Sequence, residues 1–352
     1  MNTPGAILVI HTAFIGDVIL VLPLLQVLRE RYPSSRLGIV SVPSSAGVLR
    51  NHPAVDHVHL YDKHNADRGF RGAHRTVREI RTAGYDLALI PHRSLRSAAL
   101  AWFGRIPRRV GFDTSAGRVL FTDTALYEKA HHEIRRNLDL LTPLGIAPIE
   151  SPLPRLYPSP GDAAVVEAML EAAVPKGVDR DRMVALAPGS VWFTKRWPRE
   201  SFETLARMLL RDGYSVVLVG GGEDRALCRA IADALRSEKV LNAAGELSLL
   251  QSAALLRRCM VAISNDSAPM HLATGVGTPV IGIFGATVPS FGFAPIGSRD
   301  RTVGVDALPC RPCAIHGGRR CPIGTLECMW GIEPDRVYSM IQETLHGTPR
   351  DG

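Results

Sequence analysis

The sequence predicts an α/β protein of two domains, each a mostly parallel β-sheet with helices on both faces. Short continuous apolar runs, typical of buried parallel strands, alternate with longer segments of helical character. The alternation breaks once, at residues 148–160, where five prolines fall close together. With 352 residues, 46% of them hydrophobic, the chain can form two cores of ordinary domain size.

The N-terminal half opens with the apolar run Ala6–Ile10, predicted as a strand, and a loop that contains Gly16 and Asp17. We predict helices over 18–31 and 76–83, and further strands over 37–42, 55–60 and 85–90. A segment as rich in proline as 148–160 can form neither a helix nor a central strand, so it is predicted to link the domains. The predicted domains are therefore residues 1–155 and 156–352.

The same alternation returns in the C-terminal half. Strands are predicted at 183–187, 215–219, 261–264 and 280–284, and helices at 198–212, 223–237 and 249–258, the last capped by Ser248. Ligands of such sheets bind outside the carboxyl ends of the strands, so the natural site is a cleft between the two halves.

Charge and hydropathy exclude several classes of protein. The net charge of +7 favours an anionic partner, but the arginines of the first half are scattered and no nucleic-acid-binding motif is present. No stretch approaches the ~20 apolar residues that cross a bilayer. The N-terminus has no basic region or cleavage site of a signal peptide, so we expect a cytosolic protein with reduced thiols.

The loop after the first strand supplies one candidate catalytic residue. The carboxylate of Asp17 could accept a proton from the hydroxyl group of an acceptor. Aspartate is equally favoured as the N-cap of the following helix, and position alone favours that alternative.

Two segments of the C-terminal half are candidates for phosphate binding. In the first, Ala187-Pro-Gly-Ser190 ends a strand, and Thr194, Lys195 and Arg196 precede Trp197 and a helix. Backbone amides, a hydroxyl and a lysine ahead of a helix could cradle a diphosphate. The alternative is a basic, solvated surface loop.

In the second segment, Asn265-Asp-Ser267 follows a strand and precedes a helix that begins near Pro269. Asp266 could accept from sugar or ribose hydroxyls while Ser267 faces a phosphate. Simple capping of the helix by either residue is the alternative. Gly220-Gly-Gly222 also lies between a strand and a helix, but it lacks the spacing of a dinucleotide fingerprint.

Four cysteines lie close together near the C-terminus, at Cys310, Cys313, Cys321 and Cys328. The first pair has the C-x-x-C spacing of a zinc or iron site, but the later spacings do not repeat it. Four reduced thiols in a loop-rich segment are therefore the favoured interpretation.

Taken together, these segments resemble the family 9 glycosyltransferases, the ADP-heptose:lipopolysaccharide heptosyltransferases, and among them the type II enzymes. The resemblance covers nearly the whole chain. It rests on the opening strand with Gly16-Asp17, on 85–98, on 104–112, on Ala187-Pro-Gly with Lys195-Arg-Trp-Pro198, and on Asn265-Asp-Ser267 with His271 and Phe284-Gly285. The chain departs from the family at Ala268, where glycine is usual, and in the cysteines, which only some members share.

The resemblance implies a GT-B fold, in which two Rossmann-like domains face a central cleft, and metal-independent, inverting transfer without a cofactor. Asp17 would be the general base, and the C-terminal domain would hold ADP-heptose. The donor-binding residues would be Ser190, Thr194, Lys195, Glu223, Leu247, Asp266, Ser267, Ala268 and His271.

The acceptor would be the lipopolysaccharide core on lipid A, at the cytoplasmic face of the inner membrane. The N-terminal domain would bind its anionic groups through some of Arg93, Arg96 and Arg109, although these arginines could instead form a solubilising charged surface. The alternatives are a family 9 enzyme that uses another sugar, glycan or protein acceptor, and a nucleotide-sugar-binding protein without activity. A sugar-phosphate epimerase would need a nicotinamide fingerprint, which we do not find.

Overall fold

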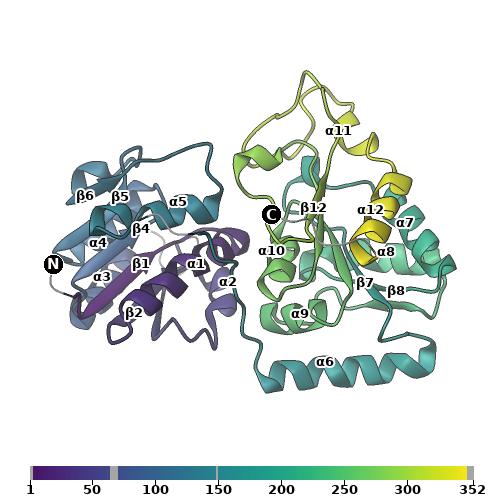
Figure 1. The fold of residues 1–352 in the computed structure, drawn as a ribbon, viewed down its shortest axis with the longest axis horizontal. Helices are drawn as coiled ribbons and strands as arrows, with labels where there is room; N and C mark the ends of the chain where they lie inside the picture. The colour runs from purple at the N-terminus through teal and green to yellow at the C-terminus, as the bar shows by residue number, and fades with distance from the viewer. Residues whose placement is uncertain (1–2, 64–69, 148–149, 347–352) are drawn as a thin grey trace. The chain divides into compact units, whose positions relative to one another are not determined.

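The computed structural model describes residues 3–63, 70–147 and 150–346. The chain divides into two compact units, Met1–Arg155 and Leu156–Gly352. Each contains one six-stranded sheet whose strands all run parallel (Figure 1). The predicted α/β class is confirmed.

The sheet of the N-terminal unit has the strand order β3-β2-β1-β4-β5-β6. Its strands are β1 Ala6–Ile10, β2 Arg36–Ser41, β3 His57–Leu60, β4 Leu87–Ile90, β5 Arg108–Phe112 and β6 Asp123–Ala125. The helices are α1 Ile15–Arg31, α2 Pro43–Ala46, α3 Phe70–Ala83, α4 Leu95–Phe103 and α5 Glu133–Asp139. Helix α1 packs against α5, and α3 packs against α4.

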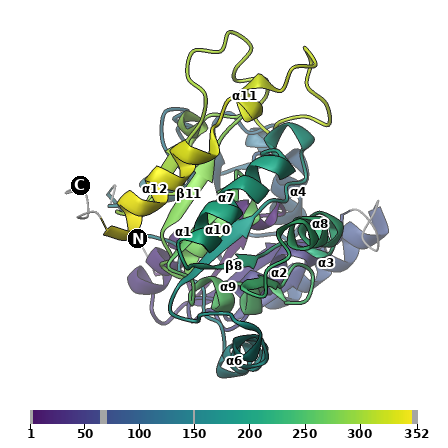
Figure 2. The ribbon, with the colours of Figure 1, turned by 90° about the vertical axis from the view of Figure 1, so that its right-hand side faces the viewer.

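The sheet of the C-terminal unit repeats this order as β12-β11-β10-β7-β8-β9. Its strands are β7 Met183–Ala187, β8 Ser215–Leu218, β9 Val240–Asn242, β10 Val261–Asn265, β11 Val280–Ile283 and β12 Arg301–Val303. The helices are α6 Pro160–Ala173, α7 Arg199–Arg211, α8 Arg225–Leu235, α9 Leu249–Leu256, α10 Ala268–Gly275, α11 Glu327–Trp330 and α12 Pro334–His346. Helix α9 packs against α6 and α10, and α7 packs against α8 and α12 (Figure 2).

The bounds of several elements differ from the prediction, and one helix that borders the predicted linker was not predicted. Helix α1 begins at Ile15, three residues before the predicted start, and α3 begins at Phe70. Helix α6 lies outside the predicted elements, and the predicted linker 148–160 overlaps its first residue. In the structure Pro160 is the first residue of α6, where proline is tolerated, and Ser159 and Asp162 form a capping box.

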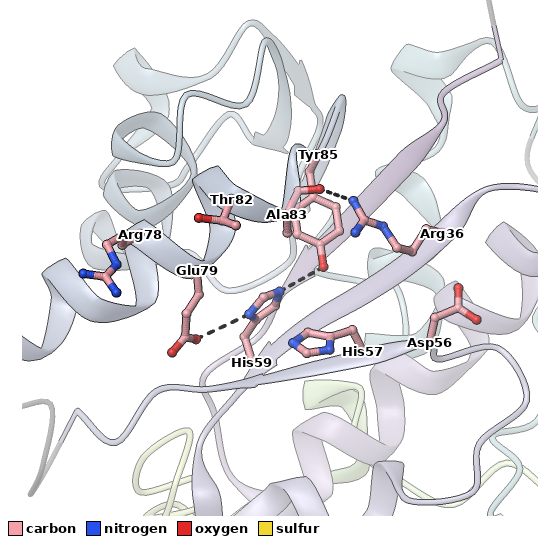
Figure 3. Close-up of a pocket in the computed structure, with 9 residues that line it drawn as sticks. All are labelled: Arg36, Asp56, His57, His59, Arg78, Glu79, Thr82, Ala83 and Tyr85. Atoms are coloured by element: carbon pink, nitrogen blue, oxygen red, sulfur yellow. Dashed lines mark hydrogen bonds and ion pairs between the residues drawn. The ribbon is translucent and has the colours of Figure 1, made fainter.

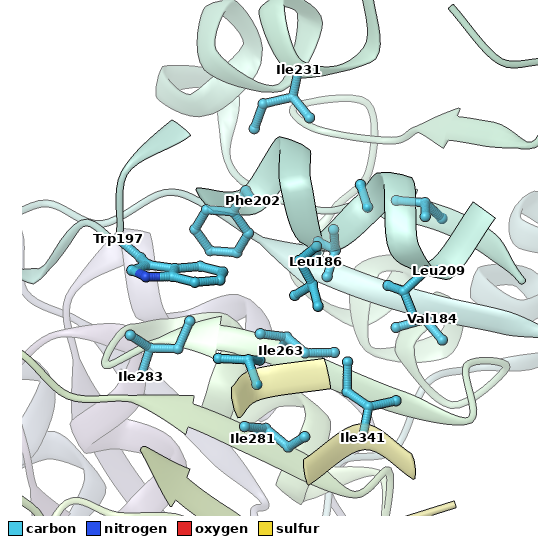
Figure 4. Close-up of a cluster of buried hydrophobic side chains, with 14 of the residues drawn as sticks. Val184, Leu186, Trp197, Phe202, Leu209, Ile231, Ile263, Ile281, Ile283 and Ile341 are labelled. Atoms are coloured by element: carbon cyan, nitrogen blue, oxygen red, sulfur yellow. The ribbon is translucent and has the colours of Figure 1, made fainter. Parts of the chain in front are cut away.

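The core of the C-terminal unit holds the end of the first candidate phosphate-binding segment, at Trp197. Trp197 is 2% exposed, and its ring packs edge-on against Phe202 with 4.9 Å between the ring centroids (Figure 4). The indole N–H donates to the carbonyl of Ile332 at 2.9 Å, so this large side chain is buried with its polar atom satisfied. The backbone just before Trp197, which carries Lys195, is thereby anchored.

No helix in the described ranges is both long and apolar enough to cross a membrane.

Candidate functional site

In the N-terminal unit, the candidate catalytic residue lies at the carboxyl edge of the sheet. The strand order changes direction between β1 and β4. Asp17 lies at the start of α1, the helix that follows β1, and Arg93 lies in the loop that follows β4. Such a topological switch point is where parallel α/β sheets bind ligands. The fold therefore brings Asp17 and the loop of Arg93 to one place.

Asp17 lies in the first turn of α1 and is not its N-cap. The N-cap position is occupied by Phe14, which makes no side-chain capping bond. The capping interpretation of Asp17 is therefore wrong. A carboxylate in the first helical turn is stabilised in its charged form by the helix dipole, which suits a group that must accept a proton only during the reaction.

Lys63, which the sequence analysis missed, joins this edge from the segment after β3. Its Nζ donates to the carbonyl of Thr12 at 2.6 Å. Burial and the charge of Arg96 lower the pKa of Lys63, whereas the charge of Asp17 raises it. The lysine therefore lies within electrostatic reach of both. Ligand sites of parallel sheets lie at the carboxyl ends of the strands. The same rule, applied to the segment after β3, indicates Lys63.

Two histidines at the same edge are held uncharged at neutral pH. Burial, with the charges of His92 and Lys63, lowers the pKa of His11 to about 3. Burial, with the charges of Lys63 and Arg93, lowers the pKa of His92 to about 4. His92 Nδ1 lies 3.2 Å from Thr12 Oγ1 and 3.0 Å from Ser97 Oγ, so it ties the loops after β1 and β4 together.

The three arginines predicted to bind the acceptor are not all brought together. Arg93 lies with its guanidinium carbon 4.0 Å from the centroid of the Tyr127 ring, and Arg96 is in the first turn of α4 near Lys63. Arg109 is the second residue of β5, at the opposite end of the sheet. Its guanidinium donates to the carbonyls of Leu120 at 2.7 Å and Pro107 at 3.1 Å. The structure thus gives Arg109 a role in holding loops and separates it from Asp17.

In the C-terminal unit, the two candidate segments meet at the corresponding switch point between β7 and β10. Lys195 Nζ lies 2.6 Å from Asp266 Oδ2, and the same oxygen accepts a hydrogen bond from Thr287 Oγ1 at 2.8 Å. Both charged side chains are largely buried, with exposed fractions of 12% and 8%. The interpretation of this segment as a solvated surface loop is therefore wrong.

Asn265 and Ser267 bind the β7 loop rather than capping α10. The side-chain amide of Asn265 donates to the carbonyl of Pro188 at 2.8 Å, and its Oδ1 accepts from the backbone N–H of Trp197 at 3.0 Å. Ser267 occupies the N-cap position, but its hydroxyl makes no capping bond and lies 3.3 Å from the carbonyl of Gly189. The capping interpretation is therefore wrong for Ser267. The side chain of Ser267 caps none of the first amide groups of α10, but Pro269 has no N–H and the N–H of Met270 donates to the carbonyl of Ser267 at 3.1 Å. The group that this helix start could offer to an anion is therefore the N–H of Ala268.

The other predicted donor-site residues are distributed along the same edge. Ser190 follows β7 and is buried, while Glu223 follows β8 and is exposed. Leu247 precedes the capping box that Ser248 forms at the start of α9, which confirms Ser248 as the cap. Ala268 and the buried His271 lie in α10. Thr194 is also buried, and its hydroxyl accepts from the N–H of Gly318 at 2.7 Å.

The model of a protein family matches most of the chain. The model of glycosyltransferase family 9 (heptosyltransferase) matches residues 73–320. The chain belongs to glycosyltransferase family 9. It is therefore a glycosyltransferase, as the sequence predicted.

Individual relatives agree with this assignment. Lipopolysaccharide heptosyltransferase 2 of Salmonella typhimurium is 27% identical over 293 residues, which cover 81% of this chain and 84% of that protein. The structure of the Escherichia coli ADP-heptose lipopolysaccharide heptosyltransferase II has a TM-score of 0.78 at 25% identity and covers 97% of this chain and 98% of that one. A family 9 structure from Veillonella parvula reaches a TM-score of 0.87 at 24% identity, with 98% of each chain covered. The predicted GT-B fold is confirmed.

The comparisons do not separate the types of heptosyltransferase. A type 3 enzyme of Escherichia coli is 26% identical to this chain, and a type 1 enzyme of Pseudomonas aeruginosa is 27% identical. These values equal or nearly equal that of the type 2 enzyme, so the family is shown and the type is not.

One cavity of this family 9 chain lies away from the candidate site. It has a volume of about 600 Å³ and is lined by side chains at the amino ends of β2 and β3 and along α3 (Figure 3). His59 lies between Tyr85 and Glu79, with Nε2 2.9 Å from the tyrosine hydroxyl and Nδ1 3.6 Å from the carboxylate. Asp17 is at the carboxyl edge of the same sheet, so this cavity lies at the other end of the sheet from Asp17.

The four C-terminal cysteines are free thiols. Within the described residues, no group of three or more His, Cys, Asp or Glu side chains is arranged to hold a metal ion. Burial raises the pKa of Cys328 to about 11, whereas backbone N–H groups, that of Leu326 first, lower the pKa of Cys321. Cys328 therefore belongs to the core, and of these two thiols Cys321 ionises more readily.

Replacing all four cysteines by serine is expected to lower the melting temperature and leave kcat nearly unchanged. Removal of the buried Cys328 sulfur costs packing, but glycosyl transfer to a hydroxyl group needs no thiol nucleophile. The measurement is a thermal melt with steady-state kinetics, preceded by metal analysis of untagged protein. A folded variant that binds donor and acceptor normally and yet has lost turnover would show that the thiols take part in the chemistry.

Proposed function

We propose that this glycosyltransferase transfers a heptose from ADP-heptose to the inner core of lipopolysaccharide, as a type II heptosyltransferase. The observation that carries the proposal is the buried Lys195–Asp266 pair beside the N-terminus of α10, at the switch point of the C-terminal sheet. The E. coli relative is named as an ADP-heptose enzyme, which supports the choice of donor.

The C-terminal unit has the groups that a nucleotide diphosphate needs. The ammonium group of Lys195 and the positive end of the α10 dipole offset the negative charge that grows on the leaving diphosphate. Asp266 holds Lys195 in place and can accept hydrogen bonds from sugar or ribose hydroxyls. Glu223 and Leu247, which follow neighbouring strands β8 and β9, lie along the same edge, where the nucleoside would bind.

In the proposed reaction, an acceptor hydroxyl oxygen attacks the anomeric carbon of the heptose. The bond from this carbon to the diphosphate oxygen breaks, ADP leaves, and Asp17 takes the hydroxyl proton. A single displacement of this kind inverts the anomeric configuration. Lys63 lies within electrostatic reach of Asp17 at this edge of the sheet.

We infer that Arg93 and Arg96 bind the anionic groups of the acceptor, and that Arg109 does not. Because lipopolysaccharide carries phosphates and carboxylates, arginine can bind them with two hydrogen bonds each. A lipid-linked acceptor of this kind would place the enzyme at the cytoplasmic face of the inner membrane.

The acceptor KM is expected to rise about ten-fold in Arg93→Ala and Arg96→Ala, because each loses a charge-assisted contact worth ~1.5–3 kcal/mol. The donor KM should stay near its normal value, and the acceptor KM of the parent enzyme should rise with salt. Arg78→Ala is the matched control, since Arg78 is an exposed arginine of the same unit that lies at the opposite edge of the sheet. An altered donor KM with an unchanged acceptor KM would overturn this assignment of the acceptor.

The type of enzyme is tested with a panel of truncated lipopolysaccharide acceptors and ADP-heptose. A type II enzyme adds the second inner-core heptose, so we expect transfer to a core that carries one heptose. Transfer only to a heptose-free core, only to a more complete core, or only to a different glycan or a protein would contradict the type II assignment. Transfer from another nucleotide sugar in preference to ADP-heptose would contradict the choice of donor.

A further inference from the structure

The loop between β12 and α11, residues 304–326, binds the segment that carries Lys195. We call it the cysteine loop, since it contains Cys310, Cys313 and Cys321, and it lies before α11 in Figures 1 and 2. The N–H of Gly318 donates to Thr194 Oγ1 at 2.7 Å, and the N–H of Thr194 donates to the carbonyl of Gly318 at 3.1 Å. These reciprocal bonds satisfy the hydroxyl and the backbone N–H of Thr194, which is only 2% exposed.

Gly317 lies directly against the side chain of Lys195. A Cβ atom at this glycine would be 3.1 Å from Lys195 Cγ and 3.2 Å from Thr194 Oγ1, closer than most such contacts in proteins. The backbone of Gly317 has a φ of +79°, which other residues rarely adopt. The loop therefore supports the lysine stem at a point where no larger residue fits without moving it.

The same loop also holds the segment on the other side of the ion pair. The guanidinium of Arg311 donates to the carbonyls of Gly285 at 2.7 Å and Thr287 at 3.2 Å. The N–H of Cys313 donates to the carbonyl of Ala286 at 3.0 Å. Thr287 in turn donates from its hydroxyl to Asp266. One loop thus contacts the backbone beside Lys195 and the backbone beside the threonine that binds Asp266.

We propose that the cysteine loop is a positioning element for the donor site, and that Gly317 sets the place of the Lys195 ammonium group relative to Asp266. The inference rests on the proposed role of this pair in binding the donor diphosphate. Lysine has a long, flexible side chain, so its contact with phosphate depends on how firmly its stem is held. The loop contributes no atom to the reaction itself.

The test compares Gly317→Ala with Gly324→Ala. Both glycines lie in the cysteine loop with a φ of +79°, but a Cβ at Gly324 would meet nothing within 4 Å. The two variants therefore carry similar backbone strain, and only the first presses on Lys195. We expect the Kd for ADP, measured by calorimetry, to rise about ten-fold in Gly317→Ala and less than about two-fold in Gly324→Ala. The acceptor KM should not change in either variant.

Equal ADP affinities in the two folded variants would overturn the inference. If Gly317→Ala does not fold, Thr194→Val and Thr194→Ser replace it. Weaker ADP binding in Thr194→Val, with parent-like binding in Thr194→Ser, supports the inference. Equal ADP binding in these two variants overturns it. Lys195→Ala is measured in parallel. Normal ADP binding in that variant would refute the donor site itself, whereas a defect confined to Lys195→Ala would refute only the role of the loop.

Discussion

Replacing Asp17 by alanine is expected to lower turnover by about 10² or more, while the protein stays folded and binds ADP-heptose almost as tightly as the parent. The expectation follows from the position of Asp17 at the carboxyl edge of the N-terminal sheet, within electrostatic reach of Lys63. A general base contributes to the transition state in which the proton moves, and it contributes little to holding the donor. The effect should therefore fall on kcat rather than on the donor affinity.

Asp17→Asn is the companion variant, because the amide has nearly the shape of the carboxylate and cannot take the proton. We expect it to be as inactive as Asp17→Ala. Kinetics of both variants, with calorimetry for ADP and a thermal melt, separate chemistry from folding. Turnover close to normal in both variants would reduce Asp17 to a residue that stabilises the start of α1 through the helix dipole.

Replacing Lys195 by alanine is expected to weaken binding of ADP by at least ten-fold and to slow turnover. One charge-assisted contact to phosphate is lost, worth ~1.5–3 kcal/mol. The change also leaves Asp266, which is 8% exposed, without its cation, so some loss of stability is expected as well. Calorimetry with ADP, performed well below the melting temperature of the variant, measures the binding effect.

Arg196→Ala is the matched control for Lys195→Ala, since it removes a neighbouring cation from the same segment. Its Nε donates to the carbonyl of Ser190 at 2.7 Å, so this side chain is occupied in holding the loop after β7. We expect a smaller effect on ADP binding from this change. Negligible and equal effects of the two variants would refute the proposal that this segment cradles the diphosphate.

The sequence predicted the fold well because parallel strands buried on both faces produce an unmistakable pattern. Continuous apolar runs such as Ala6–Ile10 and Met183–Ala187 appear as strands with the same bounds in the structure. Helix ends were less predictable, since Phe14 and Pro198 occupy N-cap positions without a capping side chain. Helix α6 was missed because proline at the first position of a helix looks the same in sequence as proline in a linker.

The candidate site was predictable only in part, because contacts between distant segments leave little trace in local sequence. The two donor segments could be recognised separately, but the 2.6 Å contact between Lys195 and Asp266 depends on β7 and β10 being neighbours in the sheet. Arg109 shows the opposite case. Its charge favoured a role in acceptor binding, yet its register in β5 places it at the other end of the sheet, where backbone carbonyls bind it.

The most direct test of the account is the mass of the acceptor after incubation with the purified protein and ADP-heptose. Lipopolysaccharide core lacking its second inner-core heptose is the substrate, and the Asp17→Asn variant is run beside the parent enzyme. We predict that the core gains the mass of one heptose, with release of one equivalent of ADP, and that the variant yields almost no product. An acceptor of unchanged mass, although the protein binds ADP-heptose, would contradict the account.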